Sequence, residues 1–536
     1  MLKHYLKTAY RNLLKNQVFS LINILGLAIG MAASLLILQY VGHELSYDGF
    51  HAHAKDTYRV TLDIYKNGER EVQSARVSPA VASSFQAEFS DIETFTRMVI
   101  LGPDAVLTYE DRYKGEADIY LADSAFFDVF SYNLLAGNAS SALNAPFCVV
   151  ITESTAQTLF KDKNPIGKDI VINAANFDNT SLPFKVTGVI EDFPENSHLQ
   201  PGVLISYPTL YEFVGHQFDD SWNWNETYTY VRINSNADPE ILETKFPEVV
   251  YRFNQAPLDE QQMDWQYKLQ PITDIHLHSD LQHESSVNGN GFYVYVLAVV
   301  GSMILLIAYI NFVNLITVKT LSRTKEVGIR KVSGAYRGQL IFQFFLESLF
   351  INIIALLLGI VILQTGAPYF SSVFDVELSW ITGSHPRLWT GLAFFMLLLV
   401  LGSGFYPAFV LSGYKPVKVL KGNMGQDRSG AALRKSLVTG QFAIALVLIA
   451  LTLAAGLQIR YMQRQSLGFN PEQVVVIKGP KAHDYGYGDN FAAFRNKLNP
   501  FTNYQQKWTG RRDHRSGAGF SSPKPEGTHQ PYPILL

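Results

Sequence analysis

Residues 292–318 form an apolar run without a single charged side chain, FYVYVLAVVGSMILLIAYINFVNLITV. The run exceeds the roughly 20 residues that an α-helix needs to cross the hydrocarbon core of a bilayer. Further apolar runs of similar length predict spans at 18–41, 341–363, 388–410 and 437–457. The chain has 536 residues and is 17% charged, whereas soluble proteins are about 25% charged. We therefore expect an α-helical membrane protein.

The first run resembles a signal peptide in one respect, because basic residues precede it. They are Lys3, Lys7, Arg11 and Lys15. The run is longer than the usual apolar region of a signal peptide, however, and no A-x-A-like cleavage site follows it. We expect residues 1–17 to form a basic cytoplasmic N-terminus and 18–41 to remain as the first membrane helix.

The distribution of charge predicts the orientation of the spans, since cytoplasmic loops of membrane proteins are enriched in Lys and Arg. Residues 1–17, 319–340 and 411–436 each hold at least four Lys or Arg and no more than one Asp or Glu. Alternation of the spans then places residues 42–291 on the far side. That segment has the opposite bias, with 37 acidic and 16 basic residues. Loop charge and span order predict the same topology.

Residues 42–291 are numerous enough to fold independently. Runs rich in β-branched and aromatic residues predict strands, and apolar residues at helical spacing predict helices. The expected strands are Tyr58–Tyr65, Cys148–Thr152, Phe184–Ile190 and Thr227–Ile233, and the expected helices are Pro79–Phe89, Ser124–Phe130, Glu153–Phe160 and Pro239–Phe253. The fold class is therefore an α-helical membrane protein with an inserted α+β extracytoplasmic domain.

Motifs of common active sites are missing from the sequence. No segment matches the phosphate-binding pattern G-x-x-x-x-G-K-[ST], the esterase pattern G-x-S-x-G or the zinc pattern H-E-x-x-H. The net charge of −3 gives no reason to expect a nucleic-acid partner. We expect no catalytic or cofactor-binding residue in this chain, and ATP bound by a P-loop is excluded.

Two histidine pairs have the spacing H-x-H, His51 with His53 and His276 with His278. On a strand, this spacing puts two imidazoles on one face, as a zinc site requires. No third ligand lies nearby in the sequence. The simpler interpretation is that both pairs are exposed strand residues, so we expect no metal site.

The predicted cytoplasmic segment between the second and third spans has a distinctive composition, SRTKEVGIRKVSGA at residues 322–335. As a short helix it places Ile329, Val332 and Tyr336 on one stripe. Glu326 and Arg330 form an i,i+4 pair on another. An alternative is that these charges have no other role than to set the membrane topology of the segment.

The segment contains two glycines, Gly328 and Gly334. Gly334 suits the end of a helix. Gly328 costs a helix about 1 kcal/mol, which indicates a close contact at that position. A second pair of glycines, Gly26 and Gly30, forms a G-x-x-x-G in the first span. Such a pair lets membrane helices pack closely, although glycine is also common in membrane helices in general.

The segment 322–335 resembles the coupling segment R-x-K-E-[IV]-G-[IV]-R-K-x-x-G-A of MacB/FtsX-type ABC transporter permeases. Other parts of the chain extend this resemblance. GFYPA at 404–408, LS at 411–412 and PVKVLKG at 416–422 are similar to that family's exit from the fourth span, and LRKSLV at 433–438 with QF at 441–442 to the start of a fifth. FF at 126–127, ITEST at 151–155, NPIGK at 164–168 and VTGVIEDFPENS at 186–197 are similar to its periplasmic core domain.

The resemblance implies a permease subunit in the cytoplasmic (inner) membrane of a bacterium. In that family a separate ATPase docks on the coupling segment, and its motion is transmitted to the outer domain in efflux, lipoprotein release or similar mechanotransmission. Residues at the matching positions are expected to couple to the ATPase: Arg323, Lys325, Glu326, Gly328, Arg330, Lys331 and Gly334. ATP is then bound by the partner subunit.

Other partners follow from the same resemblance. They are the lipid bilayer, a second permease copy, and a periplasmic adaptor or substrate protein. An alternative class is a membrane signalling or scaffold protein whose outer domain binds a ligand or activates a cell-wall enzyme without an ATPase. The sequence does not name the substrate.

The C-terminal part departs from a four-span unit. Some relatives have eight spans in two similar halves, and residues 437–457 followed by 458–501 resemble a fifth span and the start of a second extracytoplasmic domain. From 502 to 536 the composition changes to Gly, Ser, Pro and His with few periodic apolar residues. We expect a disordered polar tail there, or the product of a frame shift that truncates a duplicated permease.

Overall fold

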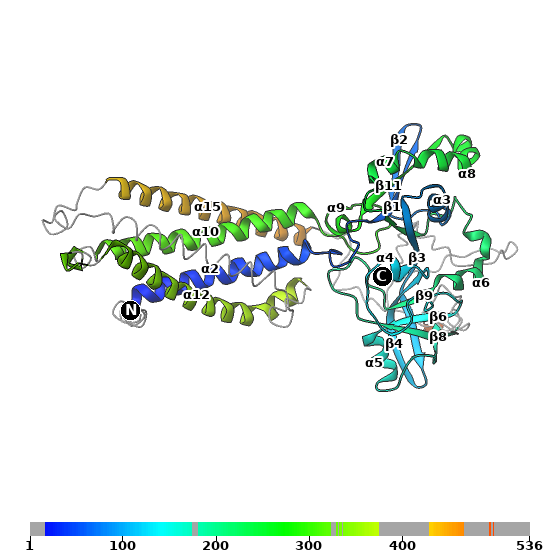
Figure 1. The fold of residues 1–536 in the computed structure, drawn as a ribbon, viewed down its shortest axis with the longest axis horizontal. Helices are drawn as coiled ribbons and strands as arrows, with labels where there is room; N and C mark the ends of the chain where they lie inside the picture. Colours follow the sequence, from blue (N-terminus) through cyan, green and yellow to red (C-terminus); the bar gives the residue numbers. More distant parts are fainter. Residues whose placement is uncertain are drawn as a thin grey trace. The chain divides into compact units, whose positions relative to one another are not determined.

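The computed structural model describes residues 17–173, 181–322, 328–330, 332–334, 336–374, 428–465, 493–494 and 497. The described chain divides into two units. We call residues 17–43 and 291–465 the membrane unit and residues 44–290 the outer domain. Figure 1 shows the helices of the first and the mixed sheet of the second.

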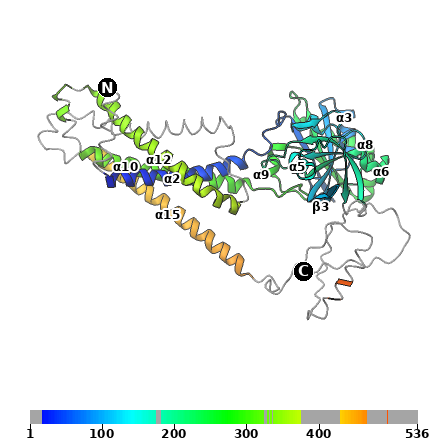
Figure 2. The same cartoon turned by 90° about the horizontal axis from the view of Figure 1, so that it is seen from below.

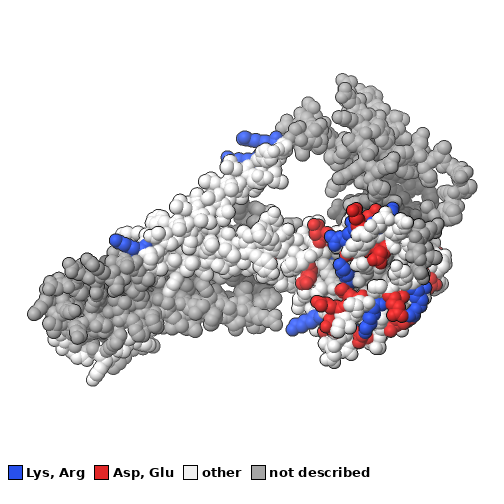
Figure 3. Space-filling model, turned by 90° about the horizontal axis from the view of Figure 1, so that it is seen from above, with Lys and Arg blue, Asp and Glu red and all other residues white. Residues whose placement is uncertain are grey.

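The described part of the membrane unit contains four helices long and apolar enough to cross a membrane. They are α2 (Gln17–Glu44), α10 (Gly291–Ser322), α12 (Arg337–Phe374) and α15 (Arg428–Arg464). The predicted runs 18–41, 292–318, 341–363 and 437–457 lie inside these helices. In Figure 3 the visible helix surface is almost free of charged residues, whereas the outer domain shows both signs of charge.

Some predicted segments lie outside the described residues. They are 1–16 of the basic N-terminus, the span 388–410, most of the loop 411–436, most of 458–501 and all of 502–536.

Helices α2, α10 and α12 pack together around one apolar core, and they lie side by side in both ribbon views (Figure 1, Figure 2). The core residues are Leu27, Ala28 and Met31 of α2, Ala308, Phe312 and Ile316 of α10, and Ile351 and Ala355 of α12. Small residues at the centre of this core let the backbones approach closely, which is how helices associate in lipid.

The outer domain is built on one 11-stranded sheet. Its strands are β1 (Thr57–Lys66), β2 (Glu69–Ser74), β3 (Ile92–Tyr109), β4 (Arg112–Ala122), β5 (Leu134–Gly137), β6 (Cys148–Thr152), β7 (Asp169–Asn173), β8 (Ser181–Ile190), β9 (Val203–Ser206), β10 (Tyr228–Ile233) and β11 (Met263–Pro271). The order is β11-β1-β10-β3-β4-β9-β6-β8-β5, with β2 beside β1 and β7 joining β3 to β8. Most pairs are antiparallel, while β4–β9 and β6–β8 are parallel.

Short helices cover the sheet. They are α3 (Ala80–Glu88), α4 (Phe126–Val129), α5 (Glu153–Phe160), α6 (Tyr211–Val214), α7 (Pro239–Glu243), α8 (Phe246–Gln261) and α9 (Ile275–His278). Each of the three main cores joins strands to such a helix, through Phe160 of α5, Phe126 of α4 and Phe85 of α3. All five residues of β6 are buried, which explains its unbroken apolar sequence.

Local sequence sets the helix boundaries. The Thr152 hydroxyl accepts a hydrogen bond from the Thr155 amide at the start of α5, and Asp238 caps α7 in the same way ahead of Pro239. The single helix predicted at 239–253 is wrong, because the chain forms α7 and α8 instead. Pro247 has no N–H for a continuing helix and occupies the first turn of α8, so α7 ends before it.

Candidate functional site

The segment that joins α10 to α12 is described at residues 328–330, 332–334 and 336. Gly328, Ile329, Arg330 and Val332 have helical backbone conformation, and the Ser333 amide donates to the Ile329 carbonyl oxygen at 2.9 Å. Gly334 follows with φ +92°, a conformation that favours glycine at the end of a helix. The turn then leads directly into α12.

The start of α12 is fixed by a side-chain hydrogen bond. The Tyr336 amide donates to Oε1 of Gln339 at 3.2 Å, which is the return bond of a capping box. This bond satisfies one of the amides that a helix start leaves without an intrahelical acceptor. The turn is thereby held against the first turn of the membrane helix.

The apolar stripe predicted for this segment is accessible in the structure. Ile329 is 59% exposed, Val332 66% and Tyr336 76%, while Gly328 is buried. We call Ile329, Val332 and Tyr336 the exposed stripe. Ile329 and Val332 lie in the helical part of the turn, whereas Tyr336 follows Gly334 and precedes α12, so the structure shows three exposed apolar side chains and not one continuous helical stripe. Each of them can bury against a protein partner.

Arg330 of the turn contacts α12 through a polar side chain. Nη1 of Arg330 donates to Oε1 of Gln343 at 2.7 Å, and Nε2 of Gln343 donates to Oε1 of Glu347 at 3.1 Å. Of the seven predicted coupling residues, Gly328, Arg330 and Gly334 lie in this described turn. Arg323, Lys325, Glu326 and Lys331 lie outside the described residues. Gln343 and Glu347 are not among the residues predicted from the sequence.

The structure places the glycine pair of the first span against α10. A Cβ built on Gly30 would lie 2.5 Å from the Cβ of Ala308, and one on Gly26 would lie 3.7 Å from Nδ2 of Asn311. Gly42, near the other end of α2, has no described residue within 4 Å of such an atom. Gly30 is therefore the closest of the three to another helix.

The histidine pairs are not exposed strand residues, and that prediction is wrong for His51 and His276. His276 and His278 lie on α9, because Pro271 ends β11 and the chain turns into short helical segments. His276 is buried, with Nε2 2.8 Å from Oε2 of Glu44 and its ring stacked on Tyr47. His51 and His53 lie in a turn before β1.

His51 belongs to a buried polar cluster with Asp48, His198 and Tyr230. Nδ1 of His198 lies 2.9 Å from Oδ2 of Asp48, and Nε2 of His198 lies 2.8 Å from the Tyr230 hydroxyl. Nδ1 of His51 accepts from the Ser131 amide at 3.1 Å. Burial lowers the pKa of His51 to about 4, against an opposing effect of Asp48. The cluster has the residue types of a catalytic site, but the side chains of Asp48, His51 and His198 are fully buried.

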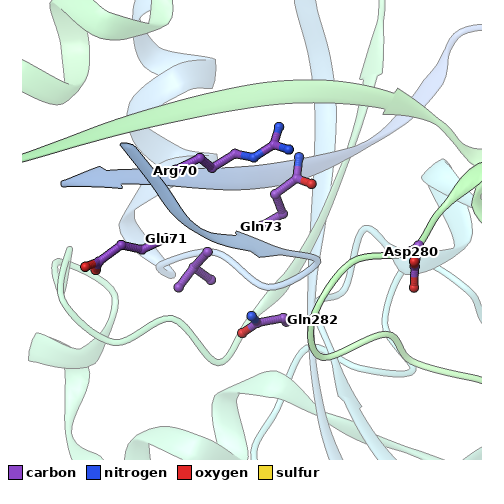
Figure 4. Close-up of a pocket in the computed structure, with 6 residues that line it drawn as sticks. Arg70, Glu71, Gln73, Asp280 and Gln282 are labelled. Carbon is purple, nitrogen blue, oxygen red and sulfur yellow. The ribbon is translucent and has the colours of Figure 1, made fainter. Parts of the chain in front are cut away.

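The outer domain has a surface pocket lined by Arg70, Glu71, Val72 and Gln73 of β2 and by Asp280 and Gln282 of the segment after α9 (Figure 4). The lining offers hydrogen-bonding groups of both charges, yet it contains no residue of the predicted functional set. Among the described residues, no three His, Cys, Asp or Glu side chains gather where they could hold a metal ion.

These features define a class of protein: a membrane protein whose folded α+β domain is inserted after its first apolar helix, with an exposed turn between the next two helices. A family model described as the MacB-like periplasmic core domain matches residues 20–249. Another, described as the FtsX-like permease C-terminal, matches residues 298–416. The chain belongs to the MacB/FtsX-like family of ABC transporter permeases, and the inserted domain is extracytoplasmic.

Two relatives illustrate the likeness. The ABC transporter permease YvrN of Bacillus subtilis is 23% identical over 430 residues, which cover 78% of this chain and 100% of YvrN. The macrolide export ATP-binding/permease protein MacB of Bdellovibrio bacteriovorus is 27% identical over 280 residues, which cover 51% of this chain and 38% of MacB. The chain thus spans well under half the length of this MacB relative.

Two solved structures of domains from related proteins each cover about two fifths of this chain. A domain of a permease protein from Porphyromonas gingivalis is 26% identical and covers 41% of this chain and 91% of its own, with a TM-score of 0.36. The periplasmic region of MacB from Actinobacillus actinomycetemcomitans is 17% identical and covers 40% and 88%, with a TM-score of 0.28.

Proposed function

We propose that this chain is the transmembrane permease subunit of an ABC transporter complex, in which a separate cytoplasmic ATPase docks on the turn between α10 and α12. ATP hydrolysis by that subunit moves the membrane helices and, through them, the extracytoplasmic domain. The motion of the extracytoplasmic domain serves efflux, lipoprotein release or similar mechanotransmission. The membrane is the bacterial cytoplasmic membrane, with the N-terminus and the docking turn inside.

The observation that supports this proposal most directly is the exposed stripe. Ile329, Val332 and Tyr336 offer apolar area in a segment that the charge distribution predicts to be cytoplasmic. A membrane protein gains nothing from exposing three large apolar side chains to water, whereas a docked partner would bury them. Tyrosine is also among the residues that contribute most binding energy at protein interfaces.

The proposal is supported by a second feature, the short path from the turn to the membrane. Tyr336 is followed directly by α12, whose first residue is Arg337. A force applied to the turn therefore reaches a membrane helix without an intervening flexible loop. The names of two relatives, an ATP-binding/permease protein and an ABC transporter permease, are consistent with a complex that contains an ATPase.

Two tyrosines provide a matched test of docking. Tyr336 is 76% exposed just before α12, and Tyr369 is 78% exposed near its other end. We expect Tyr336→Ala to weaken binding of the cognate ATPase by about 2 kcal/mol, roughly 30-fold, as for an interface hot spot. Tyr369→Ala should leave it unchanged. Binding is measured with the full chain in lipid nanodiscs, together with stimulation of ATP hydrolysis.

Equal affinity of the wild type and both variants would contradict docking at the turn. Failure of the chain to bind any ABC-type ATPase would contradict the proposed function as a whole. That outcome would favour the alternative, a membrane signalling or scaffold protein whose outer domain binds a ligand or activates a cell-wall enzyme.

A further inference from the structure

A carboxylate lies near one end of membrane helix α12, and its partners connect it to the docking turn. Glu347 is partly buried on a helix that is otherwise strongly apolar. Ionisable side chains within membrane helices are costly and are retained where a specific partner or function requires them. Glu347 accepts a hydrogen bond from Nε2 of Gln343, a side chain that is only 4% exposed.

The other end of the Gln343 amide contacts Arg330 on the turn. Oε1 of Gln343 accepts from Nη1 of Arg330 at 2.7 Å, the shorter of the two hydrogen bonds of this amide. Arg330 and Gln343 belong to different elements, separated in the chain by the turn at Gly334. A buried amide thus joins the docking turn to α12.

The side chains of Arg330, Gln343 and Glu347 have complementary hydrogen-bond donors and acceptors. A guanidinium can only donate, an ionised carboxylate can only accept, and an amide offers one group of each kind. Glu347 therefore fixes the amide so that its nitrogen faces the carboxylate and its oxygen faces Arg330. With a charged group at each end, both hydrogen bonds are of the stronger, charge-assisted kind.

We propose that Gln343 and Glu347 are positioning residues for the docking turn. Together they hold Arg330, and with it the neighbouring residues of the turn, in a fixed orientation on α12. Motion imposed on the turn by the ATPase then moves α12 as one body with it. The functional part of this inference rests on the proposed docking role, but the mechanical link does not require the ATPase to be present.

The link can be tested in the full chain alone, in nanodiscs of phosphatidylethanolamine and phosphatidylglycerol. Ser333 is exposed and suits a nitroxide spin label in a Cys148→Ala background, so the label reports how firmly the turn is held. Gln343→Leu or Glu347→Leu should raise the mobile fraction of the label about tenfold relative to the ordered one, since a charge-assisted hydrogen bond contributes at least that factor.

The matched control lies on the same helix. Within the described part of the chain, the Thr365 hydroxyl bonds to carbonyls of its own helix at Val361 and Ile362, so Thr365→Val should leave the label spectrum unchanged. Glu347→Gln keeps an acceptor for Nε2 of Gln343 but removes the charge, so it should loosen the turn less than Glu347→Leu does. Circular dichroism of each variant shows whether the helices are intact.

A charge exchange gives the sharpest test. Arg330→Glu alone leaves two carboxylates around the amide, and Glu347→Lys alone leaves two cations, so each should loosen the turn. In the double variant the amide can reverse, donating to Glu at 330 and accepting from Lys at 347, and the label should regain its wild-type order.

Two results would overturn the inference: single variants with wild-type label order, or a double variant as mobile as the single ones. Both are independent of ATPase docking. If the turn is held as proposed but Tyr336→Ala does not affect ATPase binding, the docking role fails while the link stands.

Discussion

Burial of His51 couples the stability of the outer domain to pH. Its side chain is fully buried, and Nδ1 accepts from the Ser131 amide, so the neutral form is favoured. Burial lowers its pKa from 6.5 to about 4. The resulting stabilisation is fully present above pH 6.5 and is lost as the pH falls towards 4. Between pH 7 and 5 we expect a loss of about 2 kcal/mol from this residue.

Asparagine offers a matched variant at this position, because its side-chain oxygen can replace Nδ1 as the acceptor but does not titrate. In the His51→Asn protein, the loss of about 2 kcal/mol of stability between pH 7 and pH 5 that His51 causes should be absent. The measurement is hydrogen-exchange protection of β1 and β10 in the full chain, at pH 7 and at pH 5. An identical pH dependence in both proteins would show that His51 does not titrate as argued.

Burial of Cys148 limits the reaction of its thiol with external reagents. The sequence places this single cysteine in the outer domain, where a thiol reagent added outside would reach it if it were exposed. In the structure it is buried at the start of β6, and burial raises the pKa of its thiol. We expect native Cys148 to react with external maleimide only after the outer domain is unfolded by urea. Rapid labelling of the native protein would contradict the burial of this strand.

Helix packing at Gly30 can be tested against a second glycine of the same helix. An alanine at Gly30 would bring its Cβ to 2.5 Å from that of Ala308, whereas Gly42 has open space. Overpacking costs about 1–3 kcal/mol, while the helix itself gains up to about 1 kcal/mol from a Gly→Ala change. Gly30→Ala should therefore lower the thermal unfolding temperature of the full chain in nanodiscs.

The control in this comparison is Gly42→Ala, which has the same effect on helix propensity without the close contact. It should unfold at the wild-type temperature or above it. A Gly30→Ala protein as stable as the Gly42→Ala protein would mean that α2 and α10 do not pack closely at this glycine.

At the scale of elements, the sequence predicted those parts of the fold whose pattern is continuous. β6 is an uninterrupted buried run and α5 has its Thr152 cap, and both were predicted with their observed bounds. The long hairpin of β3 and β4 was missed. Gly102 and Pro103 are residues that usually interrupt strands, and β3 continues past them only with register shifts against β4.

The candidate site was predictable to a similar degree. Helical spacing predicted one stripe of Ile329, Val332 and Tyr336; all three are exposed, but the helix ends before Tyr336. Glycine at 334, expected at the end of a helix, follows the helical residues with a positive φ. The contact of Arg330 with Gln343 was not predictable, because it depends on the direction in which the chain leaves Gly334. A sequence pattern within one element cannot report a hydrogen bond between two elements.

At the scale of the whole molecule, the predicted topology has a direct test. A cysteine at Ser333, in a Cys148→Ala background, should react with a membrane-impermeant maleimide only when the cytoplasmic face is accessible. A cysteine at the exposed position Tyr113 of the outer domain should react from the other side. Labelling of both positions from the same side would contradict the orientation predicted from the loop charges.

The central claim is that the turn between α10 and α12 is the contact site of an ATPase. The most direct measurement places a photoactivatable benzophenone side chain at Val332, which is 66% exposed, in cells that produce the full chain. A second protein carries the same group in place of Tyr369. Irradiation should link the Val332 variant to a protein that contains a P-loop and the other ABC ATPase motifs, identified by mass spectrometry, and the Tyr369 variant should give no such product. Absence of an ATPase from the Val332 products, or its equal yield at both positions, would contradict the account.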